Sequence, residues 1–129
     1  MIDASALVHL VAGDEVGEWV REEVYGANLH APELALFETT NVLRQFERDG
    51  LLSAEMAALA WTDLVALPIE LCSFAPLVDR VWELRHNLTT YDASYVALAE
   101  LGHTALVSID RRLANAPGIR CEIVAPPGS

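Results

Sequence analysis

The sequence contains no lysine, and its eight basic residues are all arginines. Against these stand 19 acidic residues, so the formal net charge is −11. A charge this negative weakens non-specific attraction to the phosphate backbone, which argues against a protein that coats nucleic acid. It does not exclude an enzyme whose acidic side chains hold a divalent metal ion.

Long hydrophobic runs are absent, and so is any clear metal-binding pattern of cysteine or histidine. No run approaches the about 18 apolar residues of a membrane span, and no charged start followed by an apolar segment marks export. Cys72 and Cys121 lie in unrelated contexts, and the histidines show no ligand spacing. We therefore expect a cytoplasmic protein with no membrane association and no zinc site.

The 129 residues, 53% of them hydrophobic, are enough for one domain with a substantial core. This apolar content is somewhat above that of a typical soluble monomer, which favours a permanent partner. No linker, repeat or low-complexity segment divides the chain. We expect a single domain over residues 1–125 and a flexible tail over residues 126–129.

Hydrophobic periodicity predicts alternating helices and strands. We expect helices near residues 5–11, 14–26, 31–50, 53–67, 75–87, 89–100 and 111–116, and strands near 29–32, 68–74, 104–109 and 122–125. Such alternation predicts a parallel sheet covered by helices on both faces, with ligands beyond the carboxyl ends of the strands.

Asp92 opens the helix expected after Thr89 or Thr90, in the stretch HNLTTYDASYVALAE. One interpretation is a capping box, in which an acid at the third helical position folds back on the cap and meets the positive end of the helix dipole. The other is functional, because the spacing of Asp92, Tyr95 and Val96 turns the carboxylate toward the core. A buried carboxylate needs a compensating partner.

Asp3 and Asp110 share one context, in which a strand is followed by an acid and then by a helix. That context places each acid at the carboxyl edge of the sheet, although either could simply cap its helix. Only two residues precede Asp3, whereas a strand usually needs about five. Either the first strand is abbreviated or the true start lies upstream.

Glu38 interrupts an apolar line, since Leu34, Glu38 and Val42 follow one another at intervals of four residues on the longest predicted helix. Asn41 lies on the same side, one turn further on. A glutamate in this setting is poorly placed to be exposed, which makes it a candidate for function.

Four carboxylates gathered at one sheet edge would raise one another's pKa and repel, so an empty cluster is unfavourable. A hard dication such as Mg²⁺ or Mn²⁺ relieves this repulsion and prefers oxygen ligands. Because such an ion can activate water and neutralise a phosphodiester's developing charge, the pattern indicates metal-dependent phosphodiester hydrolysis.

With these pieces in order, the chain resembles PIN-domain proteins of the VapC toxin family. The matching segments are DASALV at Asp3, FETTNVLR at Glu38, LTTYDASYVALAE at Asp92 and LVSIDRRL at Asp110, and they extend to about Leu113. No single segment is very specific, but their order and spacing are. The resemblance implies an α/β fold, a three-layer α/β/α sandwich with a central, mostly parallel sheet of four to five strands.

The resemblance also implies residue roles. Asp3, Glu38, Asp92 and Asp110 match the family's acidic residues, with Asp3, Asp92 and Asp110 as direct or water-mediated Mg²⁺ (or Mn²⁺) ligands and Glu38 completing the pocket. By the same match, Ser5 and Ser108 support the acids, and Arg111 or Arg112 contacts phosphate; Asn41, on the Glu38 side of its helix, is a further supporting residue.

By the same resemblance, the protein is an endoribonuclease toxin of a type II toxin–antitoxin system that cuts structured RNA, forms a homodimer and is inhibited by a VapB-type antitoxin. Two alternatives stay open: a PIN-like scaffold that binds without cleaving, and a Mg²⁺-binding phosphorelay receiver. The receiver fits less well because its chemistry uses a lysine. We also hypothesise that Arg44, Arg48, Arg80 or Arg85 lines a positively charged groove for RNA on dimerisation.

Overall fold

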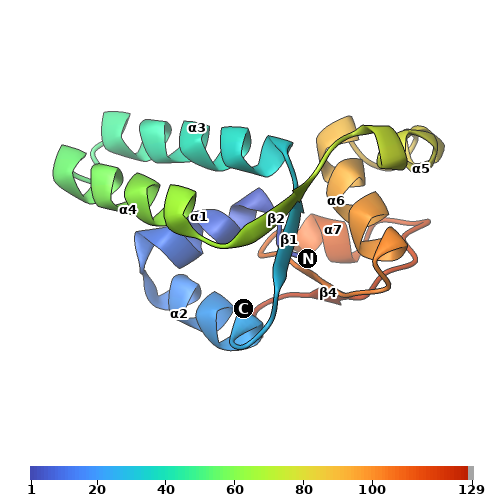
Figure 1. Ribbon diagram of the computed structural model, residues 1–129, viewed down its shortest axis with the longest axis horizontal. Coiled ribbons are helices and arrows are strands. Elements are labelled where there is room, and N and C mark those ends of the chain that lie inside the picture. Colours follow the sequence, from blue (N-terminus) through green and yellow to red (C-terminus); the bar gives the residue numbers. More distant parts are fainter. Residues whose placement is uncertain (128–129) are drawn as a thin grey trace.

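The structure is a computed structural model that describes residues 1–127, and it alternates helices with short strands (Figure 1). The elements are α1 (Ala4–Ala12), α2 (Glu15–Val24), β1 (Leu29–Pro32), α3 (Leu34–Arg48), α4 (Ala54–Ala66), β2 (Ile69–Cys72), a 3₁₀ turn (Ala75–Leu77), α5 (Val78–Glu83), α6 (Thr90–Leu101), β3 (Leu106–Val107), α7 (Arg111–Ala114) and β4 (Ile123–Val124). The helices and strands expected from residue 5 onward are present, but the strand expected before Asp3 is reduced to a single bridge at Ile2. Half of the predicted tail, residues 128 and 129, lies outside the described residues.

All of the strand pairs are parallel within the described part of the chain. β1 pairs with β2, β3 pairs with β4, and Ile2 forms an isolated parallel bridge to Val107. The Val107 N–H donates to the Met1 carbonyl at 2.8 Å, and on the other side the Ile2 N–H donates to the His30 carbonyl at 3.2 Å. The N-terminal residues therefore lie between the two sheets, giving the lateral order β2, β1, Met1–Asp3, β3, β4.

This order reverses next to Asp3. From the N-terminal segment the chain moves to β1 and β2 on one side, and then returns to β3 and β4 on the other. In open α/β folds, ligands bind outside the carboxyl ends of the strands at such a reversal. The predicted single sheet of four to five strands is not formed: the described residues form two two-stranded sheets, and Ile2 lies between them with a bridge to β3 and one hydrogen bond to β1. Two residues before Asp3 are too few for a full strand.

The helices form two groups around the strands (Figure 1). Helix α1 contacts α2, α3 and α4, whereas α5 packs on α6, and α6 in turn contacts β1 and β3. Every residue from 93 to 99 of α6 is buried. The helical spacing of Tyr91, Tyr95 and Leu98 predicts one apolar stripe, but this prediction is wrong: Tyr91 is exposed, and the helix is covered on all sides from residue 93 to 99. The small side chains of Ala93, Ala97 and Ala99 allow neighbouring elements to approach closely.

The sequence predicts that Leu34, Glu38 and Val42 face the core, but helix α3 buries the adjacent line of residues, shifted by one position. Ala35, Thr39 and Leu43 are buried, whereas Glu38 and Val42 are half-buried at the margin. This difference matters for function, since Glu38 is neither in the core nor free in solvent.

Among the described residues, no helix is both long enough and apolar enough to cross a membrane.

Candidate active site

Four acidic side chains from distant parts of the sequence line one pocket of about 330 Å³. Asp3 precedes α1, Glu38 lies on α3, Asp92 lies in the first turn of α6, and Asp110 follows β3. The pocket therefore lies at the reversal of strand order, where the N-terminal segment and β3 end side by side.

Asp3 is the most deeply buried of the four, and it is held by hydrogen bonds on its own helix. Its side-chain Oδ1 accepts from the Ser5 hydroxyl at 2.6 Å and from the Ala6 backbone N–H at 3.0 Å. The Ser5 hydroxyl lies 3.4 Å from that of Ser108, and it accepts from the Ile109 N–H at 3.2 Å. Ser5 and Ser108 thus connect the loop after β3 to Asp3.

Asp92 and Asp110 also lie at the starts of helices. The Thr89 hydroxyl accepts from the Asp92 N–H at 3.1 Å, so Thr89 is the N-cap of α6. Asp110 caps α7 by accepting from the Arg112 N–H at 3.0 Å. The capping and pocket interpretations are therefore compatible, since both carboxylates take part in a helix start and line the pocket.

Glu38 has a partner that the sequence did not identify. The hydroxyl of Tyr95, on α6, donates to Glu38 Oε1 at 2.5 Å, and Tyr95 itself lines the pocket. We expected Tyr95 to be a core residue, and with 2% of its surface exposed it is one. Only the tertiary contact between α3 and α6 shows that the polar end of this buried ring faces a carboxylate.

The four carboxylates influence one another electrostatically. Burial raises the pKa of Asp3, Glu38 and Asp92 above their usual range. Repulsion adds to this effect, because Asp92 raises the pKa of Asp3, Asp92 and Asp3 raise that of Glu38, and Asp110 raises that of Asp92. The pKa of Asp110 is lowered, chiefly by its hydrogen bond from Arg112. The negative charge is thus concentrated enough to favour a cation.

The carboxylates are not drawn together into a finished chelate. No group of three or more acidic, histidine or cysteine side chains within residues 1–127 is arranged as a metal-binding cluster. Three of the acids instead accept from a donor in the protein: Asp3 from Ser5, Glu38 from Tyr95 and Asp110 from Arg112. The donor set nevertheless suits Mg²⁺, which binds oxygen ligands, keeps several waters and needs only one or two direct carboxylates.

The other predicted residues lie in different places. Asn41 is exposed, accepts from Arg44 Nε at 3.0 Å and does not line the pocket. The position one turn beyond Glu38 that does line it is Val42. Arg112 lies beside the pocket and binds Asp110 through Nε at 3.1 Å and through a terminal nitrogen at 2.8 Å. Arg111 donates to the Pro126 carbonyl at 2.9 Å.

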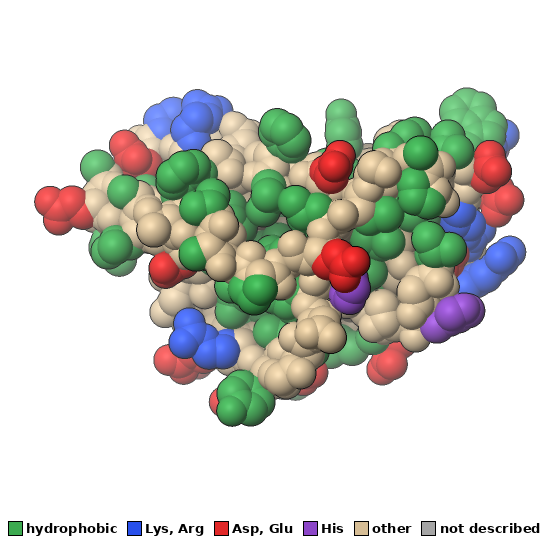
Figure 2. Space-filling view, viewed as in Figure 1, with side chains coloured by type: hydrophobic (Ala, Val, Ile, Leu, Met, Phe, Trp, Pro, Cys, Tyr) green, Lys and Arg blue, Asp and Glu red, His purple; other side chains and the backbone are tan. Residues whose placement is uncertain are grey.

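The arginines expected to line a groove do not gather at the acids within one chain. None of the four lines the acidic pocket in the described part of the molecule. Arg80 binds Glu100 at 2.6 Å, and Arg85 stacks on Trp82 with its guanidinium carbon 4.4 Å from the ring centroid. Basic side chains lie at separate places on the face shown in Figure 2, so the single chain does not support the groove hypothesis.

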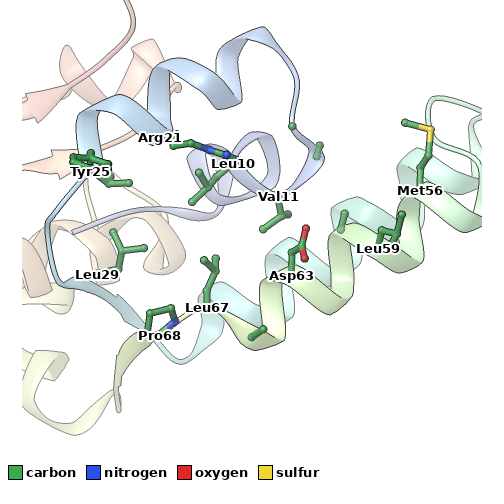
Figure 3. Close-up of a pocket in the computed structure, with 15 residues that line it drawn as sticks. Leu10, Val11, Arg21, Tyr25, Leu29, Met56, Leu59, Asp63, Leu67 and Pro68 are labelled. Atoms are coloured by element: carbon green, nitrogen blue, oxygen red, sulfur yellow. The ribbon is translucent and has the colours of Figure 1, made fainter.

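A larger cavity, of about 650 Å³, lies between α1, α2 and α4. Figure 3 shows Leu10 and Val11 of α1 across from Asp63 of α4. Its lining is mostly apolar, with Asp63 as the single carboxylate and Arg21 as the single basic residue. A cavity of this composition suits binding, but it lacks the grouped carboxylates that the acidic pocket offers for chemistry.

A parallel α/β fold with four acidic side chains in one pocket defines a class of protein, and comparison with known proteins identifies that class. The family model described as "PIN domain" matches residues 1–119. Ribonuclease VapC1 of Mycobacterium tuberculosis is 38% identical over 128 residues, covering 95% of this chain and 94% of the relative. Ribonuclease VapC3 of Pyrobaculum aerophilum is 36% identical and covers 89% and 92%. The crystal structure of PAE2754 from Pyrobaculum aerophilum has a TM-score of 0.63 at 26% identity, covering 88% and 82%.

The chain therefore belongs to the PIN-domain family and, within it, to the VapC ribonucleases.

Proposed function

We propose that this chain is a metal-dependent endoribonuclease that hydrolyses phosphodiester bonds in structured RNA, as the toxin of a type II toxin–antitoxin system in the cytoplasm. One observation carries the proposal: acidic side chains from four separate parts of the chain, Asp3, Glu38, Asp92 and Asp110, line one pocket at the reversal of strand order. The relatives named ribonuclease VapC, which span nearly the whole chain, support the choice of RNA as substrate.

In this proposal Asp3, Asp92 and Asp110 hold Mg²⁺ or Mn²⁺, directly or through water, and Glu38 completes the pocket. When bound, the ion supplies a water of lowered pKa and neutralises charge that develops on the phosphate. Ser5 and Ser108 fix Asp3, because Ser5 donates to its carboxylate and links to Ser108.

Arg112 is the arginine best placed to contact the scissile phosphate. Its guanidinium is anchored on Asp110, and it is exposed over most of its surface. A guanidinium has five N–H donors, and the two nitrogens bonded to Asp110 leave others for a phosphate oxygen. Arg111 is the less suitable of the two, since it donates to the Pro126 carbonyl.

A homodimer and a VapB-type antitoxin are the proposed protein partners. Two separate apolar regions support them: the cavity in Figure 3, and the exposed aromatic residues Phe37, Phe74 and Tyr91, which line another cavity of about 330 Å³. Soluble monomers rarely expose large contiguous apolar patches, so partners that cover these regions are expected.

Of the two alternatives, the phosphorelay receiver is excluded by membership of the PIN-domain family. A measurement of RNA cleavage distinguishes the nuclease from the alternative, a scaffold that binds without cleaving. All four acids are present in one pocket, which favours the nuclease.

The deciding experiment compares RNA cleavage by the unaltered protein and by Asp92→Asn, with Mg²⁺, with EDTA, and with Mg²⁺ restored. We expect Asp92→Asn and EDTA each to reduce cleavage by at least about a hundredfold, since each removes metal binding at the reacting phosphate. Asp79→Asn, an exposed acid on α5, is the matched control and should cleave normally.

Circular dichroism and thermal unfolding should show that both variants remain folded. Undiminished cleavage by folded Asp92→Asn would contradict the proposed site. No cleavage by the unaltered protein on any RNA, with metal supplied, would favour the scaffold.

A further inference from the structure

The pocket that holds the four acids continues into a region without carboxylates. At this end it is lined by Val8 and His9 of α1 and by Val42 and Phe46 of α3. Val8 is buried, whereas Phe46 and His9 are half-buried, so an aromatic ring and an imidazole border the open space. One cavity therefore has an acidic end and an aromatic end.

The two ends are separated by a fixed length along the helices. Glu38, Val42 and Phe46 follow at intervals of four on one face of α3, so Phe46 lies about 12 Å beyond Glu38 along the axis. On α1, which contacts α3, His9 lies about 9 Å beyond Asp3. A phosphate bound at the carboxylates is too small to reach Phe46 and His9. A nucleotide attached to that phosphate is long enough to reach them.

The orientation of the His9 ring is set by a second residue. Asp14 Oδ2 lies 2.5 Å from His9 Nδ1, and Asp14 Oδ1 accepts from the Gly17 N–H at 2.8 Å as the cap of α2. The helices meet closely here, because a Cβ added to Gly17 would lie 2.0 Å from the His9 carbonyl oxygen. An ionised carboxylate only accepts, so His9 Nδ1 donates to Asp14, and Nε2 is the ring nitrogen left for a ligand.

The His9 Nε2 atom has no hydrogen-bond partner within the described residues. It is therefore available to a polar group of a ligand, while the Phe46 ring can pack against a planar group. Unstacked bases of RNA are recognised in this way, by stacking on aromatic side chains and by hydrogen bonds to their edges. A second phosphate would instead be repelled by the nearby acids, so an uncharged planar group suits this end better.

We infer that Val8, His9, Val42 and Phe46 form a nucleobase subsite for a nucleotide next to the scissile phosphate, with Phe46 packing on the base and His9 Nε2 forming a hydrogen bond to its edge. This inference rests on the proposed function. It adds that an unpaired base bound in the subsite selects which phosphodiester bond is cut. The 330 Å³ pocket is at the small end of ligand sites, so it accepts one unpaired base and excludes a duplex. Cleavage is then confined to loops and unpaired positions of a structured RNA.

The test measures binding of short RNA to the Asp92→Asn protein, in which cleavage is removed, with Mg²⁺ present. The probes are the hexanucleotides of adenine, cytosine and uracil and a hexamer with the same sugar–phosphate backbone but no bases. Phe46→Ala and Phe46→Leu remove the aromatic ring, Phe46→Tyr retains it, and His9→Phe keeps a ring without nitrogen atoms. Thermal unfolding of each variant separates loss of binding from loss of structure.

We expect the abasic hexamer to bind about five- to a hundredfold more weakly than the best base-containing hexamer, because stacking of one base contributes about 1–3 kcal/mol. Phe46→Leu should abolish this difference, and Phe46→Tyr should restore it. His9→Phe should keep the difference but reduce the preference among adenine, cytosine and uracil.

Equal binding of the abasic and base-containing hexamers to the Asp92→Asn protein would overturn the subsite, as would an undiminished difference in folded Phe46→Leu. These results concern bases alone. The proposed function fails separately, if Asp92→Asn still cleaves RNA. Loss of cleavage in Asp92→Asn together with base-independent binding therefore rejects the subsite and keeps the nuclease.

Discussion

At the scale of the residue, three of the four carboxylates in the site are held by a donor from the protein. Asp3 is held by Ser5, Glu38 by Tyr95 and Asp110 by Arg112. These donors stabilise ionised carboxylates against burial and mutual repulsion, and they fix the positions of the oxygens. Tyr95 is the least expected of them, since its sequence context is that of a core residue.

Tyr95→Phe tests whether this hydroxyl positions Glu38. Burial raises the pKa of Glu38 and the Tyr95 hydroxyl lowers it, so removal of the hydroxyl lets the pKa rise further. If Glu38 acts ionised, the acid limb of the pH–rate profile for RNA cleavage should move to higher pH, and kcat should fall more than KM rises.

Tyr91→Phe is the matched control, because Tyr91 lies on the same helix but is exposed. It should leave the pH–rate profile unchanged. An unshifted profile in a folded Tyr95→Phe protein would show that the hydroxyl serves packing alone.

At the scale of the element, helix starts connect structure to function. Asp3, Asp92 and Asp110 each lie at the start of a helix, and α1 and α6 direct the positive ends of their dipoles toward the pocket. The capping pattern could be predicted from single residues and their neighbours, because a cap is a local interaction. The buried line of α3 could not, because the packing of α3 against α1 and α4 decides which of two adjacent lines faces inward.

A separate ion pair joins α5 to α6 and to the segment before β4. Arg80 donates to both oxygens of Glu100 and to the Gly118 carbonyl, and the Arg120 N–H donates to Glu100 at 2.8 Å. The Glu100 side chain is 13% exposed. Burial alone would raise its pKa, but the hydrogen bonds from Arg80 and Arg120 outweigh burial, and the pKa is lowered.

Glu100→Gln should therefore lower the free energy of unfolding at pH 7 by about 2–3 kcal/mol, as loss of one partner of a largely buried pair does. Because the folded pKa is depressed, this stabilisation is present above the unfolded value of about 4.3 and is lost as pH falls through the folded pKa. Urea unfolding at pH 7 and at pH 3 should show the difference between the proteins narrowing in acid.

The control is Glu83→Gln, which removes an exposed partner of the same arginine. It should cost under about 0.5 kcal/mol, since exposed ion pairs contribute little. Equal effects of the two substitutions would contradict the importance of burial for the Glu100 pair.

At the scale of the whole molecule, a single chain exposes apolar side chains that have no role in its own core. Phe37, Phe74 and Tyr91 come from α3, the segment after β2, and α6, and they line one cavity beside the helix face that bears Glu38. Phe37 is 78% exposed. A second copy docked here would cover these rings and border the acidic pocket.

Phe37→Glu should convert the proposed homodimer to a monomer, because it places a charge in the apolar contact. Light scattering coupled to size-exclusion chromatography gives the mass directly. Tyr25→Glu is the matched control, since Tyr25 is also an exposed aromatic residue but lines the other apolar cavity. A dimer that persists in Phe37→Glu but dissociates in Tyr25→Glu would move the contact to that cavity.

The sequence by itself determined the elements, the helix caps at Asp3, Thr89 and Asp110, and the family to which the chain belongs, because hydrophobic period, capping and motif order are properties of neighbouring residues. Only the tertiary structure decided that the strand order reverses at Asp3, that Tyr95 meets Glu38, that Asn41 lies outside the pocket, and that His9 and Phe46 share a cavity with the acids. These are contacts between segments distant in the chain. These contacts depend on which faces of the helices and strands pack together, and turning a helix or strand by one residue position would bring different side chains into contact.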